Sequence, residues 1–333
     1  MTRVAMMGGG SWGTAFAVVL AEAGSQVTLW TRGEEMAADI NQFHRNSRYH
    51  PDVDIPETII ATTDPQEALQ SAEIVVLAVP AQSLRANLMD WAPWIGDEAV
   101  YVSLIKGIEL GTSMRMSEVI AEVTGADPQR IAVVSGPNLA KEIIARQPTA
   151  TTVAASTQAS AVAIQQACTT DYFRPYWTTD VIGTEIGGAV KNVLAIVCGI
   201  VLGKGLGRSA HAAIMARGFA EMTRLGIALG ARPDTLTGLC GLGDLVLTCS
   251  SEMSRNMSCG LALGRGETLD TILQGRLAVT EGVATAPALK KLAQEHDVDM
   301  PISFALADIL AGHMTVDEAM VDLMSREHRF EAE

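Results

Sequence analysis

A glycine-rich turn, Gly8-Gly9-Gly10-Ser11-Trp12-Gly13, follows a short apolar run that begins at Val4. Its spacing is GxGxxG, and it joins a predicted strand to a predicted helix. In that context Gly8 permits a tight turn, Gly10 lets the backbone approach a pyrophosphate, and Gly13 lets the helix pack on the strand. The N–H groups at the start of the helix then face the phosphates. We predict a dinucleotide-binding turn, and the alternative is a glycine turn that binds no ligand.

The first half of the chain alternates predicted strands, rich in Val and Ile, with predicted helices. The strands are Val4–Met7, Gln26–Trp30, Ile74–Val79, Val100–Leu104 and Ile131–Ser135, and two further runs, Thr149–Ala154 and Phe173–Thr178, extend the sheet. The helices are Trp12–Ala23, Glu34–Gln42, Ala81–Trp94 and Met114–Val123. This alternation predicts an α/β Rossmann-type fold, with a parallel doubly wound sheet.

After about residue 182 the strand-like runs stop, and helical patterns follow one another. These helices are Glu185–Leu202, Ala210–Leu229, Ser254–Leu263, Thr268–Leu273, Ala284–Glu295, Ile302–Leu310 and Val316–Met324. The last helix begins at a capping box formed by Thr315 and Glu318. We therefore expect a dinucleotide-binding domain over residues 1–180 and an all-α C-terminal domain that binds the substrate over residues 181–333.

The end of the second predicted strand bears on the choice of cofactor. NAD-binding folds usually place Asp or Glu there to bind the ribose 2′-hydroxyl. Here the strand ends Trp30-Thr31-Arg32, and the first acidic residue is Glu34. A guanidinium suits a 2′-phosphate, so we expect NADP or NAD as cofactor, with NADP preferred. The alternative is that Arg32 stacks on the adenine, because arginine performs both functions.

Lys191 lies in a predicted helix, Glu185 to Ile196, that is apolar almost all round. Burial of an ammonium is costly and lowers its pKa, which suits a group that exchanges a proton near neutral pH. The alternative is a structural lysine whose amine extends to the surface. The adjacent Asn192, with Asp244 and Arg255 further along the chain, favours the catalytic interpretation.

A second glycine-rich segment, from Gly238 to Cys249, carries Asp244 and Thr248. Ser254-Arg255-Asn256 follows at the start of a predicted helix. A hydroxyl, a guanidinium, an amide and the positive end of a helix dipole together favour anion binding. The alternative is a helix N-cap next to a surface arginine.

Composition and charge exclude some classes of partner. The chain has 38 acidic and 24 basic residues and a formal net charge of −14, which argues against binding to nucleic acid or to an anionic membrane. Five cysteines without metal-ligand spacing are typical of reduced thiols in a cytoplasmic protein. The apolar stretch Ile186–Leu202 contains Lys191, so we expect a buried core helix and no membrane insertion. We predict no metal site, and surface or packing positions for the histidines, which are His44, His50, His211, His296, His313 and His328.

Several blocks spread over the chain resemble one family. They are GGGSWGTA from Gly8, KGIE from Lys106, SGPNLAKE from Ser135, GGAVKNVLAI from Gly187, GLGDLVLTCSSEMSRN from Gly241 and VTEGVAT from Val279. In this order and over essentially the full length, the chain is similar to the bacterial NAD(P)-dependent glycerol-3-phosphate dehydrogenases. The resemblance implies hydride transfer between NAD(P)H and dihydroxyacetone phosphate, giving sn-glycerol 3-phosphate for glycerophospholipid synthesis. It also implies a homodimer.

The resemblance implies roles for residues at matching positions. Lys191 would be the catalytic proton acceptor. Added to Gly8, Gly10 and Gly13 of the turn, the cofactor contacts would be Ser11, Trp12, Arg32, Lys106, Ala140, Arg255, Val279 and Glu281. The glycerol-phosphate pocket would comprise Lys106, Gly136, Asn138, Lys191, Asp244, Ser254, Arg255 and Asn256.

Two features depart from the family pattern. Asn138 occupies a position where Ser or Thr is frequent, and residues 205–209 lack the usual acidic, Asn-containing loop. Two other functions stay open. Another two-domain reductase, of β-hydroxyacid or ketopantoate type, would share the coarse architecture. A dinucleotide sensor without chemistry would not need Lys191, Asp244 and Arg255.

Overall fold

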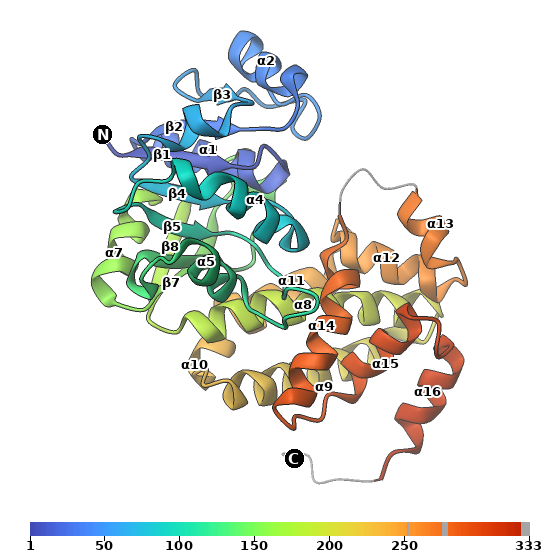
Figure 1. Ribbon diagram of the computed structural model, residues 1–333. Coiled ribbons are helices and arrows are strands. Elements are labelled where there is room, and N and C mark those ends of the chain that lie inside the picture. The colour runs from blue at the N-terminus through green and yellow to red at the C-terminus, as the bar shows by residue number, and fades with distance from the viewer. Residues whose placement is uncertain (252, 275–278, 328–333) are drawn as a thin grey trace.

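The computed structural model describes residues 1–251, 253–274 and 279–327 of the 333-residue chain. Over these residues a twisted sheet with helices on both faces forms one part of the molecule, and packed helices form the other (Figure 1). The predicted α/β fold followed by an all-helical part is therefore confirmed. His328 lies outside the described residues.

Within the described residues the sheet has eight strands in the order β3-β2-β1-β4-β5-β6-β7-β8. The order of the first six positions is that of a doubly wound dinucleotide-binding sheet. The strands are β1 (Arg3–Met7), β2 (Gln26–Trp30), β3 (Ile60–Thr62), β4 (Ile74–Leu77), β5 (Val100–Ser103), β6 (Ile131–Ser135), β7 (Thr149–Ala155) and β8 (Phe173–Thr178). The seven predicted strands are present, and β3 is an addition.

The sheet is parallel except at one pair. β7 runs antiparallel to β6, with Ser135 opposite Thr152, whereas we expected a parallel sheet throughout. A parallel neighbour needs a crossover connection, usually a long helix. The chain between β6 and β7 contains only the five-residue helix α6 (Ala140–Ile144). It therefore turns back at the end of β6, and β7 runs in the opposite direction. β8 then pairs with β7 in parallel.

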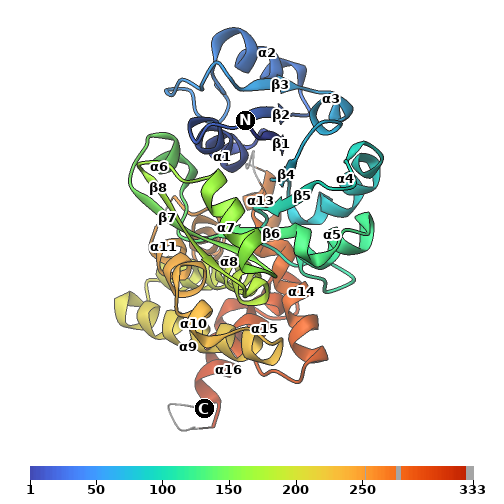
Figure 2. The ribbon, with the colours of Figure 1, turned by 90° about the vertical axis from the view of Figure 1, so that its left-hand side faces the viewer.

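Helices cover both faces of the sheet because successive strand residues point to opposite sides. In β1, Val4 and Met6 pack into the apolar cluster on one face, and Ala5 and Met7 pack into the cluster on the other. Figure 2 shows α1, α6 and α7 on one side and α3, α4 and α5 on the other. Besides α6, this part of the chain has the helices α1 (Ser11–Glu22), α2 (Glu34–Phe43), α3 (Pro65–Leu69), α4 (Leu84–Trp91), α5 (Met116–Thr124) and α7 (Gln158–Ala167). It also has the short 3₁₀ turns η1 (Ala81–Ser83), η2 (Ala92–Trp94) and η3 (Pro128–Arg130).

The helical part is built around α8 (Val181–Gly203), which packs against most of its neighbours (Figure 1). This helix is long and apolar enough to cross a membrane, but 89% of its apolar window is buried inside the fold. It is therefore the core helix that we expected. The other elements are α9 (Gly207–Ala228), α10 (Pro233–Leu236), η4 (Leu239–Gly243), α11 (Asp244–Ser250), α12 (Arg255–Gly264), α13 (Leu269–Gln274), α14 (Glu281–Glu295), α15 (Pro301–Leu310) and α16 (Val316–Ser325).

Two helices of the helical part, α8 and α12, pack closely against each other. A Cβ at Gly199 or at Gly260 would overlap the backbone of the other helix. This contact holds the start of α12 near the middle of α8. The expected boundary after residue 180 falls between β8 and α8, at the N-cap residue Asp180. The predicted capping box of α16 is also present, at Thr315 and Glu318.

Candidate active site

The glycine turn lies at the carboxyl edge of the sheet, between β1 and β4. Gly8 has a φ of +136°, and a Cβ on it would lie 2.7 Å from the carbonyl oxygen of Ala78, the residue after β4. A Cβ on Gly13 would overlap the carbonyl oxygen of Gly8, so α1 packs directly on the turn. A Cβ on Gly10, by contrast, would have no described protein atom within 4 Å. The turn is thus closed toward the sheet and open at Gly10, as expected for a turn that receives a ligand.

The N-terminus of α1 can hold an anion. Its N-cap residue is Gly10, no side chain caps the helix, and its first turn has no acidic residue. The positive end of the helix dipole and the first N–H groups therefore face the open side of the turn. Ser11 and Trp12 are the first two helical residues. The indole N–H of Trp12 is buried and has no hydrogen-bond partner among the described residues.

Two more of the predicted cofactor contacts lie near this edge. Arg32 is the second residue after β2, and it is exposed. Ala140 begins α6, which packs against α1. The structure places both on loops or helix starts that follow parallel strands, where ligands bind in open α/β sheets.

Lys191 and Asp244, both buried, form an ionic cluster with the partly buried Lys106 beneath this edge. Asp244 accepts from Lys191 through Oδ1, at 3.0 Å from Nζ, and from Lys106 through Oδ2, at 2.6 Å from Nζ. Lys191 also donates to the hydroxyl of Thr248 at 2.9 Å, and Thr248 donates to Asp244 at 3.1 Å. Asp244 and Thr248 lie one turn apart on α11, so both face α8. Asp244 thus joins a lysine of the helical part to a lysine of the loop after β5.

The electrostatics of the cluster favour proton exchange at Lys191. Burial lowers the pKa of Lys191 to about 8; the charge of Asp244 opposes this effect and that of Lys106 reinforces it. Burial alone would raise the pKa of Asp244, but the charges of Lys106 and Lys191 overcome it and hold that pKa below its usual value. Asp244 is therefore a carboxylate at neutral pH, and Lys191 is the group that can lose a proton close to neutrality.

The loops after β5 and β6 meet at this cluster. Lys106 follows β5, and its ammonium also donates to the backbone carbonyl of Gly136, at 2.9 Å. Gly136 follows β6 directly, and a Cβ on it would lie 3.0 Å from Thr151 of β7. Asn138 is held against β7 as well, because it accepts from the Thr151 hydroxyl at 2.8 Å and donates to the Ala150 carbonyl at 3.2 Å.

Ser254, Arg255 and Asn256 stand at the start of α12, as we predicted. Ser254 is the N-cap residue and its hydroxyl accepts from the N–H of Met257, at 3.2 Å. Asn256 is buried, whereas Arg255 is exposed. An exposed guanidinium at the positive end of a helix with ten residues is suited to an anion.

A chain of side-chain amides connects α12 to the lysine cluster. Asn256 donates to the side-chain oxygen of Asn192 at 2.8 Å, and Asn192 donates to the backbone carbonyl of Lys106 at 3.0 Å. The side-chain oxygen of Asn256 accepts from the N–H of Gly282 at 3.0 Å, in the first turn of α14. The predicted anion site, the buried lysines and α14 are therefore one connected unit.

Glu281, the first residue of α14, reaches from the helical part to the sheet edge. Its Oε1 accepts from the N–H of Ala81, at 3.4 Å, at the start of η1 after β4, and its Oε2 is buried with no partner among the described residues. Burial raises the pKa of Glu281, while Arg255 opposes this effect. An unpaired buried carboxylate oxygen at this edge is suited to a ligand hydroxyl. Val279, two residues before, is exposed.

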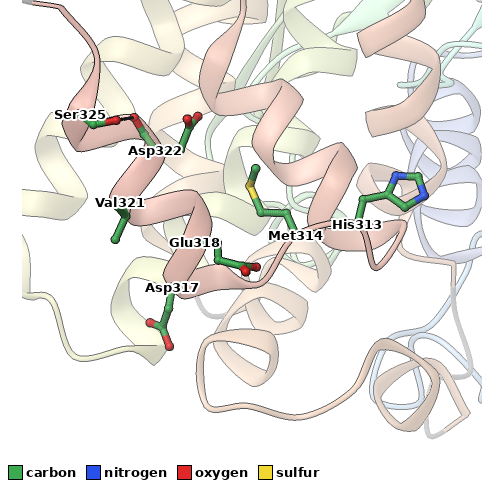
Figure 3. Close-up of a pocket in the computed structure, with 7 residues that line it drawn as sticks. All are labelled: His313, Met314, Asp317, Glu318, Val321, Asp322 and Ser325. Atoms are coloured by element: carbon green, nitrogen blue, oxygen red, sulfur yellow. Dashed lines mark hydrogen bonds between the residues drawn. The ribbon is translucent and has the colours of Figure 1, made fainter.

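A hollow on the surface of the helical part lies away from these residues. It has a volume of about 650 Å³ and lies along α16 and the turn before it, between His313 and Ser325 (Figure 3). Its side chains include Asp317, Glu318 and Asp322 but none of the predicted site residues. The glycine turn, the lysine cluster and the start of α12 instead place the candidate active site at the carboxyl edge of the sheet.

Some residues that support the site have no sequence signal. Thr151 orients Asn138, and it lies in a strand that we predicted without a functional role. His50, which we assigned to the surface or to packing, is buried and contacts Ser11 of the glycine turn. Asn192 adjoins Lys191 in the sequence, but its bond to the Lys106 carbonyl joins residues 86 positions apart. Such contacts can be identified only from the three-dimensional structure.

The fold and the site define the class: a two-part NAD(P)-dependent oxidoreductase, with a dinucleotide turn on a doubly wound sheet and a buried lysine of lowered pKa that is linked through Asp244 to Lys106 after β5. Residues 3–161 match the family described as NAD-dependent glycerol-3-phosphate dehydrogenase N-terminus, and residues 180–321 match its C-terminus. The chain belongs to this family of glycerol-3-phosphate dehydrogenases.

Relatives agree over the full length. The chain is 52% identical over 332 residues to a glycerol-3-phosphate dehydrogenase [NAD(P)+] of Corynebacterium aurimucosum, covering 99% of this chain and all of the relative. It is 53% identical over 326 residues to glycerol-3-phosphate dehydrogenase [NAD(P)+] 2 of Mycobacterium tuberculosis, covering 98% and 97%. These relatives are bacterial, as the sequence blocks indicated.

Comparison with solved structures distinguishes this family from the ketopantoate reductases. The glycerol-3-phosphate dehydrogenase of Coxiella burnetii has a TM-score of 0.92 at 37% identity, covering 97% of this chain and 98% of that one. A ketopantoate reductase of Ralstonia eutropha has a TM-score of 0.58 at 16% identity. The second likeness is one of fold alone.

Proposed function

We propose that this chain is an NAD(P)-dependent sn-glycerol-3-phosphate dehydrogenase, which interconverts dihydroxyacetone phosphate and sn-glycerol 3-phosphate. The observation that carries the proposal is the Lys191–Asp244–Lys106 cluster, in which the buried Lys191 and Asp244 meet a lysine of the loop after β5. Membership of the family and the names of the relatives support the choice of substrate. We further propose that residues 1–180 bind the cofactor and that residues 181–333 complete the substrate pocket.

The cofactor would lie along the carboxyl edge of the sheet. The open space at Gly10, the uncapped start of α1 and the unpaired Oε2 of Glu281 fit a dinucleotide. Its pyrophosphate would be held at Ser11 and Trp12, and Glu281 would accept from a hydroxyl. The further contacts would be Arg32, Lys106, Ala140, Arg255 and Val279. When bound, the cofactor supplies or accepts a hydride at its nicotinamide ring.

Arg32 is our basis for proposing a preference for NADP. It is the second residue after β2, near the strand end where NAD-specific folds have an acidic residue. Its exposed guanidinium is able to pair with a 2′-phosphate in two-point geometry. Stacking on the adenine would instead leave NAD and NADP equally favoured.

The substrate would lie between the lysine cluster and the start of α12. Arg255 and Asn256 would hold the phosphate, assisted by Ser254 and the helix dipole, while Gly136 and Asn138 would close the pocket from the sheet. Binding energy from the phosphate then positions the reacting carbon. The amide chain from Asn256 through Asn192 ties this anion site to Lys106.

Lys191 carries the proton. In ketone reduction its ammonium donates a proton to the carbonyl oxygen, and in the reverse direction the neutral amine accepts the proton of the C2 hydroxyl. Asp244 orients Lys191 and stabilises its charged form, and Thr248 fixes the direction of the amine. Lys106 adds positive charge where negative charge develops on the substrate oxygen.

The wider setting of the enzyme is also a proposal. We propose a cytoplasmic homodimer that supplies sn-glycerol 3-phosphate for glycerophospholipid synthesis. Apolar side chains on the surface of the helical part, such as Val321 and Met324, which are 65% and 82% exposed, support an interface there. Sedimentation of the purified protein tests the dimer.

The direct test is the absorbance of NADPH when dihydroxyacetone phosphate is added to the purified protein, repeated with NADH. We expect rapid loss with NADPH and slower loss with NADH. Faster loss with NADH would keep the reaction but reject the role of Arg32. No loss with either cofactor in folded protein would reject the substrate assignment and favour another reductase or a sensor.

A further inference from the structure

The segment from Asn46 to His50 forms a tight turn that packs on the glycine turn. The two end residues form an isolated bridge, and the backbone N–H groups of Tyr49 and His50 both bond to the carbonyl of Asn46. Asn46 donates from its amide to the carbonyl of Gly9, at 3.1 Å, and to the hydroxyl of Thr14, at 2.9 Å. Asn46 and His50 are 0% and 3% exposed. This buried segment therefore supports the glycine turn from within the fold.

His50 contacts the residue at the start of α1. Its Nε2 lies 2.9 Å from the carbonyl oxygen of Ser11 and 3.3 Å from the Ser11 hydroxyl. A carbonyl oxygen only accepts, so Nε2 must carry the hydrogen. Because Nε2 carries the hydrogen, it cannot accept a hydrogen bond from the Ser11 hydroxyl. The oxygen of that hydroxyl instead accepts from the same Nε2–H. The hydrogen of the Ser11 hydroxyl is consequently directed away from His50.

The protonation state of His50 agrees with this geometry. Burial lowers the pKa of His50; the bond to the Ser11 backbone opposes this effect and the charge of Lys141 reinforces it. The ring is therefore neutral at neutral pH, with its single hydrogen on Nε2. A neutral ring in this tautomer holds Ser11 without placing a buried charge against the helix start.

We propose that His50 is a positioning residue for the cofactor phosphates. Its Nε2–H fixes the carbonyl and the hydroxyl of Ser11, so that the hydroxyl hydrogen and the N–H groups at the start of α1 are available to a phosphate oxygen. This inference rests on the cofactor site proposed above. It adds a residue that lies behind the glycine turn and belongs to a different segment of the chain.

The test uses four variants of the full-length protein. His50→Leu fills the space without a donor, and His50→Asn has its amide too close to the backbone to replace Nε2. His50→Gln places an amide nitrogen where Nε2 stands. His313→Gln is the matched control, because the side chain of His313 is 75% exposed and distant from the turn. For each we would measure the Kd for NADPH by calorimetry, kcat, both KM values and the melting temperature.

We expect His50→Leu and His50→Asn to raise the Kd and the KM for NADPH roughly three- to tenfold, the effect of one lost hydrogen bond. The KM for dihydroxyacetone phosphate and kcat at saturating NADPH should stay unchanged, and His50→Gln should bind NADPH nearly as the wild type does. If His50→Leu does not fold, His50→Asn carries the same comparison with His50→Gln.

Three results would overturn the proposal. In the first, the Leu and Asn variants bind NADPH as tightly as the wild type. In the second, the Gln variant is as weak as they are. In the third, kcat and both KM values change by the same factor, which indicates general damage to the fold. A wild type that binds NADPH but does not reduce dihydroxyacetone phosphate would reject the proposed function and leave the binding comparison valid. A wild type that binds neither cofactor would reject both.

Discussion

Asp244 and Lys191 lie 3.0 Å apart, between Oδ1 and Nζ, and their side chains are only 2% and 10% exposed. The other oxygen of the same carboxylate binds Lys106 at 2.6 Å. Two ammonium groups on one carboxylate leave a net positive charge in a buried site, which favours the loss of one proton. The lowered pKa of Lys191 identifies the group that loses it.

The first prediction concerns pH. Reduction of the ketone requires the ammonium form of Lys191, whose pKa is about 8. Thus kcat/KM for dihydroxyacetone phosphate should be level below pH ~7 and decline as the pH rises through 8, while kcat/KM for glycerol 3-phosphate should rise over the same interval. Initial rates in both directions measure the two profiles. Profiles that are flat between pH ~7 and ~10 in both directions would contradict the assignment.

A variant of Asp244 sharpens this test. Asp244 raises the pKa of Lys191, so Asp244→Asn should move the decline in the reductive direction to lower pH. Asp90→Asn on the exposed surface of α4 is the control and should leave the profile in place. The same midpoint in both variants would mean that Asp244 does not set the protonation of the catalytic group.

The second prediction concerns cofactor choice. Arg32→Ala should raise the KM for NADPH about tenfold or more, because a charge-assisted pair with the 2′-phosphate is lost. The KM for NADH should change little, since NADH has no phosphate at that position. Equal increases for both cofactors would instead support stacking of Arg32 on the adenine.

The third prediction concerns the phosphate of the substrate. Arg255→Ala should raise the KM for dihydroxyacetone phosphate about tenfold or more, through loss of a charged donor. Arg265→Ala, at the exposed C-cap of the same helix, is the matched control. An unchanged KM in the Arg255 variant would exclude its role in phosphate binding.

The fourth prediction concerns stability. Glu221 of α9 caps α15 by accepting from the N–H groups of Ile302 and Ser303, at 2.7 and 3.1 Å. Burial raises the pKa of Glu221 to about 7 from an ordinary value of 4.5, although its hydrogen bonds oppose this. A carboxyl with a raised pKa contributes stability that is complete below pH 4.5 and is lost as the pH rises to about 7.

Thermal unfolding of the wild type and of Glu221→Gln between pH ~5 and ~8 tests this linkage. The Gln variant does not titrate, so the wild type should lose stability relative to it as the pH increases. A constant difference in melting temperature across this range would show that the pKa of Glu221 is not raised in the folded state.

Much of the fold could be predicted because its strands are buried on both faces. Runs such as Ile131–Ser135 consist almost wholly of apolar residues, and the structure has a strand with the same bounds. β3 was missed because it has only three residues, Ile60–Thr62, at the sheet edge, with Ile60 half exposed. β7 pairs antiparallel with β6 because the connection between them is short. This connection has no strong sequence pattern that would predict the change of direction.

Less of the candidate site than of the fold could be predicted from the sequence. Burial of Lys191 followed from the apolar helix around it, and the start of α12 followed from its capping residue. α11 was missed because it follows glycines directly, yet this helix is what brings Asp244 and Thr248 to the same face. The ion pair of Lys106 with Asp244 joins residues 138 positions apart, and no local pattern encodes such a distance. Family resemblance supplied the role of Lys106, the glycine-rich segment itself singled out Asp244 and Thr248, and the geometry supplied their contacts.

The most direct test of the proposed mechanism is the turnover of Lys191→Met with NADPH and dihydroxyacetone phosphate. Methionine retains the length and much of the packing of lysine but carries no proton, so kcat should fall by a factor of roughly 10² to 10⁴. The Kd for NADPH should stay near that of the wild type, and Lys204→Met, at an exposed position after α8, should be fully active. A Lys191→Met variant that keeps most of its activity would contradict the mechanism.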